Sequence, residues 1–236
     1  MSRLRDLAAR EAVSCEAVSC EAVRLEAVRR DRRRLLTAAA VPLLGLAAGG
    51  CTNLRGDVPA HVYYELDDQA QPQRDAGPRV ERRLLVTGTA GSTLYDSVGL
   101  AYSRAPGARS YYQFASWSEA PAQRVMRLAQ RRLAALGVFQ DVAGVTSAVR
   151  GDWLLELQLD QMYHDDLSPP GNARIDVFAE LVDWRERRAL ARRPFSVREP
   201  LAQENAAAAA AAFNRALTRL LDELADWVLT QARAAA

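Results

Sequence analysis

The sequence predicts an α/β domain of the α+β type, a single domain in which a mostly antiparallel sheet packs against two helices. Residues 152–163 and 173–183 alternate apolar and polar side chains, and a Ser-Pro-Pro-Gly-Asn turn joins them, which predicts two antiparallel strands. Residues 118–136 and 203–232 instead repeat apolar side chains every three or four positions, as amphipathic helices do. Each helix has one apolar face, so both are expected to pack against the sheet.

Further strands are predicted from short apolar or alternating runs, at residues 62–66, 82–87, 98–103, 110–115, 138–143 and 189–197. The third and fourth of these flank Ala-Pro-Gly-Ala, a turn sequence, so we expect them to form an antiparallel hairpin. The second is expected to end at Gly88, where a small flexible loop, Gly-Thr-Ala-Gly-Ser, begins.

Both predicted helices have an identifiable beginning or packing face. Ser118 is the expected N-cap of the first helix, Pro121 falls in its first turn, and Gly137 follows its last turn. The second helix is expected to begin at Gln203. Its apolar stripe consists of Phe213, Leu217, Leu220, Leu221, Leu224 and Trp227 or Val228.

The N-terminal part of the chain carries an export signal. An arginine cluster precedes an apolar run from Leu35 to Ala48, and small residues then lead to Cys51, a layout typical of a bacterial lipoprotein signal peptide. The run has 14 residues, whereas a membrane-spanning helix needs about 20. An N-terminal core helix is the alternative, and Pro42 argues against it. We therefore expect residues 29–50 to be removed and Cys51 to become a lipidated N-terminus.

The segments on either side of the signal have different characters. Residues 1–28 contain a five-residue Glu-Ala-Val repeat that fits neither a helix nor a heptad, and we interpret them as a misplaced translation start or a disordered repeat. Residues 51–78 are rich in Gly, Pro and polar side chains and are expected to be a tether with one short strand. Residues 79–232 then form the folded domain.

Export route and destination follow from residues near the signal. Arg32-Arg33-Arg34-Leu35-Leu36 resembles a twin-arginine signal, although an ordinary basic n-region also explains it, so the route stays open. Thr52, a residue other than Asp after the cysteine, favours sorting to the outer membrane. We expect a periplasmic, lipid-anchored protein.

The charge balance excludes one class of partner. From Cys51 onward the chain carries 22 Arg and 23 Asp and Glu residues, a formal charge of about −1. A nucleic-acid-binding domain keeps a basic excess, so no nucleic-acid partner is expected. Cys51 is the one cysteine in this part of the chain, so a disulfide within the domain is excluded.

The sequence offers little for catalysis. It lacks a nucleophile elbow, a phosphate-binding loop and an H-E-x-x-H motif. Two histidines, His61 and His164, are too few for a metal site with defined ligand spacing. His164 with Asp165 or Asp166 leaves a hydrolase open as a minor hypothesis, but we expect His164 in a solvated loop after a strand. No enzyme activity, metal or cofactor is predicted.

An aromatic cluster is the most distinctive feature of the folded part. Tyr111 and Tyr112 lie in a predicted strand, and Trp117 precedes the first helix. One interpretation is a half-buried strand whose Trp117 anchors the helix start. The other is an exposed tyrosine face that binds a partner protein, because Tyr and Trp are enriched at interfaces. Tyr111, Tyr112 and Trp117 are therefore candidate partner-binding residues.

Short motifs in a fixed order suggest a family. They are Cys51, Tyr63-Tyr64-Glu65-Leu66, Leu84-Leu85-Val86, Val98–Ser103, Tyr111-Tyr112 with Ala115, Trp117 and Pro121, Leu136-Gly137-Val138-Phe139, Asp152 with Leu154 and Leu157, and Phe213 with Ala216, Leu220 and Trp227. In this order they resemble the ABC-type transport auxiliary lipoproteins, the family of the paraquat-inducible accessory lipoprotein that works with MCE-domain lipid transporters.

The resemblance implies a fold and a role. It implies a mostly antiparallel sheet backed by two helices, and a non-catalytic accessory part in lipid transport between the inner and outer membranes. The implied partners are an MCE-domain protein and ABC transporter subunits, the membrane through the lipid anchor, and other copies of the chain in a homo-oligomer. The alternative is an envelope lipoprotein with a structural or outer-membrane assembly role.

Overall fold

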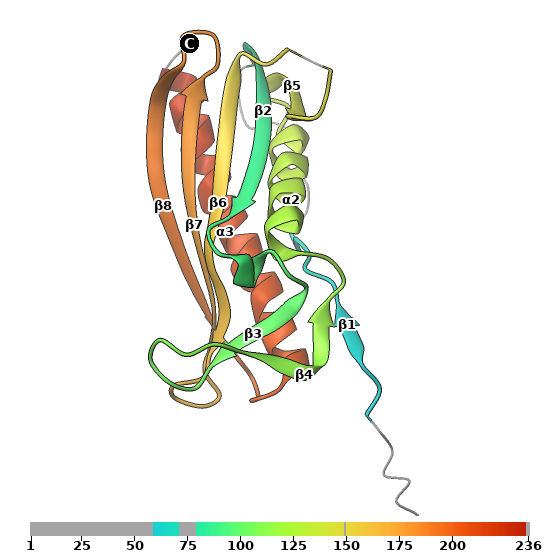
Figure 1. The fold of residues 1–236 in the computed structure, drawn as a ribbon. Coiled ribbons are helices and arrows are strands. Elements are labelled where there is room, and N and C mark those ends of the chain that lie inside the picture. The colour runs from blue at the N-terminus through green and yellow to red at the C-terminus, as the bar shows by residue number, and fades with distance from the viewer. Residues whose placement is uncertain (1–58, 71–78, 149, 235–236) are drawn as a thin grey trace, which may run out of the picture. The chain divides into compact units, whose positions relative to one another are not determined.

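One mixed sheet with two long helices on one of its faces makes up the part of the chain that the computed structural model describes (Figure 1). That part comprises residues 59–70, 79–148 and 150–234. Cys51, with the expected start segment and signal peptide, lies outside it.

The strands are β1 (Val62–Tyr64), β2 (Val80–Ala90), β3 (Gly99–Ser103), β4 (Ser110–Trp117), β5 (Phe139–Gly144), β6 (Trp153–Asp165), β7 (Asn172–Asp183) and β8 (Arg188–Pro200). The helices are α2 (Pro121–Ala135) and α3 (Ala206–Ala234), and a short 3₁₀ helix, η1 (Thr93–Tyr95), follows β2. The predicted α+β class, a single domain with one sheet and two helices, is confirmed.

β6 is the strand from which the sheet branches. On one side it pairs antiparallel with β7, which pairs antiparallel with β8. On the other side its first half pairs parallel with β2, and its last two residues pair parallel with β3. β5 continues the first branch parallel to β2, whereas β4 and then β1 continue the second. The longest ladders are antiparallel, and β1, β5 and β8 are the edges of the described sheet.

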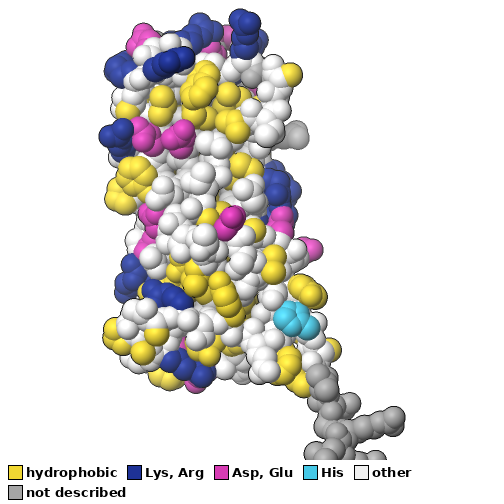
Figure 2. All heavy atoms as spheres, viewed as in Figure 1, with side chains coloured by type: hydrophobic (Ala, Val, Ile, Leu, Met, Phe, Trp, Pro, Cys, Tyr) yellow, Lys and Arg dark blue, Asp and Glu magenta, His cyan; other side chains and the backbone are white. Residues whose placement is uncertain are grey.

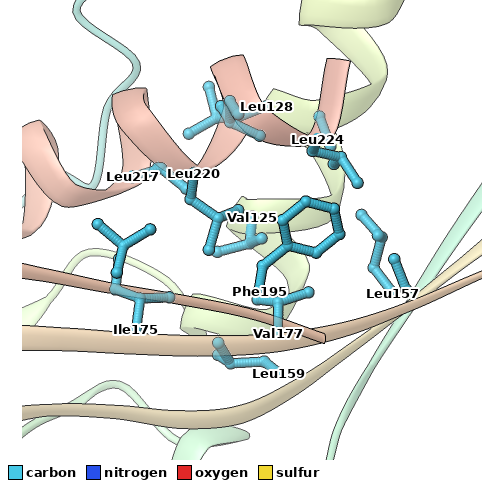
Figure 3. Close-up of a cluster of buried hydrophobic side chains, with 14 of the residues drawn as sticks. Val125, Leu128, Leu157, Leu159, Ile175, Val177, Phe195, Leu217, Leu220 and Leu224 are labelled. Atoms are coloured by element: carbon cyan, nitrogen blue, oxygen red, sulfur yellow. The ribbon is translucent and has the colours of Figure 1, made fainter. Parts of the chain in front are cut away.

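The core lies between the sheet and the helices (Figure 3). Leu217 and Leu220 of α3 face Ile175 and Val177 of β7 and Phe195 of β8, and each of these side chains is at most 2% exposed. Burial of one such side chain contributes about 1.5–3 kcal/mol. The apolar stripes predicted from the sequence are thus the packing faces of the helices.

Two predicted helix starts need correction. The N-cap of α2 is Ala120, which makes no side-chain hydrogen bond. Ser118 lies before the helix and donates its backbone N–H to the Tyr64 carbonyl (2.8 Å), which continues the β1–β4 pairing. α3 begins at Ala206, where Asn205 Oδ1 accepts from the Ala208 N–H (2.8 Å) as a capping side chain does.

Gly88 does not end its strand as predicted, because β2 continues through it to Ala90. A Cβ atom at Gly88 would stand 2.8 Å from Cβ of Met126 on α2. The missing side chain therefore lets α2 approach the sheet closely, and the glycine has a packing role inside a strand.

A candidate interaction surface

Exposed aromatic residues gather where β1, β4 and β3 lie side by side. Tyr63 is 66% exposed, Tyr111 43% and Phe114 38%, although all three are large and apolar. Together with the exposed His61 they are named the aromatic surface below. Figure 2 shows hydrophobic side chains around the exposed histidine.

The strand register explains why these residues share a face. Tyr63 is the partner of Ser116 in the parallel β1–β4 pair, and Gly99 is the partner of Ser116 in the antiparallel β3–β4 pair. Partners in a ladder point to the same face, and Phe114 lies two residues before Ser116 on that face. The opposite face of β4 carries Ala115 and Trp117, which are buried.

Tyr111 is held in place by its hydroxyl and by a glycine. The hydroxyl donates to the Leu94 carbonyl (3.0 Å) and lies 3.2 Å from Ser97 Oγ. The ring covers Gly99, where an added Cβ would stand 2.3 Å from Cδ1 of the tyrosine. Tyr111 is therefore a fixed aromatic group with one side open to solvent.

His61 connects the two outer strands of this surface. Its Nε2 lies 2.9 Å from Ser116 Oγ, and its ring is 4.9 Å from the Tyr63 ring, centroid to centroid, with 49° between the planes. The histidine thus orients Tyr63 across the β1–β4 pair. No sequence pattern assigned His61, Tyr63 and Phe114 to a binding surface, although the period-two alternation places His61 and Tyr63 on one face of the strand.

Trp117, a candidate partner-binding residue, lies in the core. Its side chain is 2% exposed and packs edge-on against Phe213 of α3, with ring centroids 5.5 Å apart. It anchors the region before α2, as the first interpretation of the aromatic cluster expects. A partner has no access to its indole in this conformation.

Tyr112 is half-buried and belongs to a hydrogen-bonded network. Its ring is nearly parallel to the His164 ring, with 9° between the planes and 6.3 Å between the centroids, and its hydroxyl lies 2.8 Å from His164 Nδ1. Burial raises the pKa of Tyr112 to about 12. Tyr111 and Tyr112 therefore differ in role, since the former lies on the surface and the latter supports the interior.

A solvated loop was predicted for His164 from the sequence, and this prediction is wrong. His164 is fully buried in β6. Its Nε2 lies 2.9 Å from the Pro170 carbonyl, an acceptor, so Nε2 carries the proton and Nδ1 accepts from the Tyr112 hydroxyl. The ring thereby ties the β3–β4 hairpin to the turn between β6 and β7. Both nitrogens are bonded and neither reaches solvent, so this histidine cannot act on a substrate from outside.

The nearby charged groups are also paired within the domain. Asp166 is buried, and its Oδ2 accepts from Nε of Arg104 (2.8 Å), while Oδ1 has no hydrogen-bond partner and lies 3.9 Å from His164 Nε2. Arg104 also pairs with Glu204 (2.7 Å), just before α3. This network holds three segments together at one end of the sheet.

The face of the sheet that carries neither α2 nor α3 mixes hydrophobic with charged side chains (Figure 2), and its charged groups pair with one another. Arg174 binds Asp176 (2.6 Å), Arg192 binds Glu180 (2.7 Å), and Ser196 donates to Asp176 (2.7 Å). Because these groups satisfy one another, the aromatic surface is the better candidate for a binding site.

The described ranges contain no group of three or more His, Cys, Asp or Glu side chains placed to hold a metal ion. None of their helices combines the length and the hydropathy needed to cross a membrane.

Comparisons with known proteins agree with this fold. XCC0632 from Xanthomonas campestris is 26% identical with a TM-score of 0.67, and the match covers 74% of this chain and 98% of that chain. The crystal structure of an uncharacterized protein shares the fold at 13% identity and a TM-score of 0.57, covering 72% of this chain and 99% of the other. No match is found among curated proteins. A model of the ABC-type transport auxiliary lipoprotein component matches residues 64–225, most of the chain, and the chain therefore belongs to this family.

Proposed function

We propose that this protein is a non-catalytic, periplasmic lipoprotein subunit of an MCE-type ABC lipid-transport system that links the inner and outer membranes. The observation that carries the proposal is the family match over residues 64–225. The fold adds an exposed aromatic surface suited to a protein partner. The subunit is expected to hold the transporter at the membrane and to leave transport chemistry to the other subunits.

The proposed anchor is Cys51, which Thr52 directs to the outer membrane. Pro59, the first described residue, lies eight positions after Cys51, and eight extended residues span at most about 30 Å. The domain would therefore stay close to the membrane that holds its lipid, and β1, the short strand within the predicted tether, would lie nearest to the anchor in the sequence.

The proposed docking site is the aromatic surface, with Tyr111 at its centre. Tyrosine supplies a large contact area at a small cost in conformational entropy, and Tyr111 is already fixed by the Leu94 carbonyl and Gly99. Of the three residues singled out in the sequence, Tyr111 is the direct contact in this proposal. Tyr112 and Trp117 support the surface from inside.

The proposal excludes a hydrolase that depends on His164. The ring of this histidine is enclosed, and both of its nitrogens are hydrogen-bonded to groups of the domain. General acid–base catalysis needs a side chain within hydrogen-bond reach of the substrate. Catalysis by His164 would require the β3–β4 hairpin to open first.

Co-purification tests the proposal. The full-length lipoprotein is produced together with an MCE-domain protein of the same organism, extracted in detergent and captured through a tag on the lipoprotein. The MCE-domain protein should copurify, and a Tyr111→Ser, Phe114→Ser double variant should weaken its retention at least about tenfold, as loss of interface aromatics does.

Trp184→Ser is the matched control, because Trp184 is 52% exposed but lies in the turn between β7 and β8. It should leave retention unchanged. Absence of the MCE-domain protein from the wild-type eluate, also after crosslinking, would contradict the proposal and favour a structural role in the envelope.

A further inference from the structure

We propose that the outer edge of β1, along which no described strand pairs, binds an extended segment of the transporter partner as an added strand. The inference rests on the proposed function and specifies how the partner meets the aromatic surface. Strand addition derives its affinity from main-chain hydrogen bonds and its specificity from the flanking side chains. β1 offers both at one place in the chain.

The edges of the described sheet differ in how they are protected. β8 carries Arg192, Arg193 and Arg198 together with Pro194, and charges and proline are the usual means of keeping an edge from pairing. β5 carries Asp141 and contacts α2. β1 has the sequence Val-Tyr-Tyr and contains neither a charge nor a proline.

The backbone of Tyr63 faces this open edge. The Tyr64 carbonyl accepts from the Ser118 N–H on the β4 side (2.8 Å). Successive residues of a strand direct their N–H and C=O groups to opposite edges, so both groups of Tyr63 point away from β4. The N–H donor and the C=O acceptor of Tyr63 thus lie along this edge, and the side chains of Val62 and Tyr63 beside them are exposed.

The side chains define the chemistry of the incoming segment. Tyr63 projects on the face of the aromatic surface and Val62 on the opposite face, so the added strand needs apolar residues on both of its faces. Glu65 follows at the same edge, is exposed, and makes no ion pair with a described residue. A Lys or Arg beside the apolar segment would meet this carboxylate.

Other occupants fit this edge less well. A bilayer offers no backbone groups, so contact with hydrocarbon would leave the Tyr63 N–H unsatisfied. A second copy of the chain that used its β8 or β5 edge would bring the charges and the proline of β8 or Asp141 of β5. An extended segment of a different protein need carry neither.

Backbone amide exchange in the complex tests the inference directly. With the full-length lipoprotein in detergent and the MCE-domain protein as the probe, exchange of the Tyr63 N–H should slow at least about tenfold on binding, because the amide becomes part of a ladder. The backbone N–H of Trp184 already donates to the Asp152 carbonyl (2.9 Å), so its exchange rate should not change on binding.

Two variants separate the backbone from the side chain. Tyr63→Ala removes the ring and keeps the N–H, whereas Tyr63→Pro removes both, and proline is tolerated on an edge strand. Tyr63→Pro should therefore raise the Kd about 3–10-fold above that of Tyr63→Ala, the effect of one hydrogen bond. Matching unfolding curves confirm that both variants fold.

Each other outcome has a definite meaning. Equal Kd values for the two variants, or unchanged Tyr63 exchange in a complex that forms, would overturn strand addition and leave the proposed function standing. No binding by the wild type would overturn the proposed function itself. A Tyr63→Pro variant that instead loses self-association, or binding to phosphatidylethanolamine–phosphatidylglycerol vesicles, would assign the edge to a second copy or to lipid.

Discussion

The pair of half-buried Tyr112 and buried His164 shows how single residues maintain the candidate surface. Tyr112 belongs to β4, the strand that carries Tyr111 and Phe114, and His164 belongs to β6. The hydroxyl of Tyr112 donates to His164 Nδ1, and His164 Nε2 donates to the Pro170 carbonyl. The aromatic surface therefore depends on hydrogen bonds that lie beneath it.

His164→Ala should lower the free energy of unfolding by about 2–4 kcal/mol, because it removes two buried hydrogen bonds and leaves a cavity. Urea unfolding followed by circular dichroism measures this change. His61→Ala is the control, since this histidine is exposed, and should cost less than about 1 kcal/mol. Equal midpoints for the His164 variant and the wild type would contradict the assigned role.

Tyr112 should make stability depend on alkaline pH. Burial raises its pKa to about 12 in the folded protein, whereas the unfolded value is 10.0. Between these values the unfolded chain loses the proton while the folded chain keeps it, so the free energy of unfolding falls as pH rises. The contribution is complete below pH 10 and lost by about pH 12. Since Tyr112 is only half-buried, it amounts to about 1–2 kcal/mol.

Tyr112→Phe isolates this contribution, because the other tyrosines titrate in both proteins. Urea unfolding of the two proteins at about pH 9 and about pH 11.5 should show a smaller loss of stability in the variant. The same loss in both would mean that Tyr112 ionises as freely as a solvent-exposed tyrosine.

Among the elements, α2 owes its close packing on β2 to Gly88. Gly88→Ala should destabilise the fold by about 1–3 kcal/mol, because the new Cβ would meet Met126 at 2.8 Å and the helix would have to shift. Thermal unfolding measures the loss. Gly144→Ala is the control, since its nearest neighbour is Gln130 Oε1 at 3.5 Å, and should change stability by less than about 1 kcal/mol. Similar melting temperatures for the two variants would contradict this role of Gly88.

The elements with local signals were predictable from the sequence. Both helices follow from their apolar stripes, and the β6–β7 and β3–β4 pairs follow from turns between neighbouring strands. The parallel pairs of β2 with β5 and with β6 have no such signal, because a helix and distant residues separate the partners. Gly88 was misjudged for the same reason, since its contact with Met126 exists only in the folded protein.

The candidate surface was predictable in part. The aromatic residues were visible in the sequence, but their orientations depend on a register shift between Gly99 and Ala101 in the β3–β4 pair. This irregularity interrupts the period-two alternation in β4, so the strand pattern alone does not reveal that Phe114 is exposed while Tyr112 is half-buried. The environment of His164 depends on Tyr112, 52 residues away in the chain, and no local pattern reveals that contact.

The whole molecule joins a family fold, a proposed lipid anchor and an exposed aromatic surface. The family places the chain among transport auxiliary lipoproteins. The proposed lipid on Cys51 would keep the domain at a membrane, and the aromatic surface lies on β1, within the predicted tether, and on β3 and β4, which follow it in the chain. These features suit a subunit that positions a partner near the membrane, and its internally paired charges add to the stability of a domain without disulfides.

Photo-crosslinking in cells tests this central claim most directly. A photoreactive amino acid replaces Tyr63 in the full-length lipoprotein, with Trp184 replaced in the matched control, and both are produced with all transporter subunits. Position 63 should crosslink to the MCE-domain subunit, and position 184 should not. No adduct from position 63, or equal adducts from both positions, would contradict the claim that this surface holds the transporter.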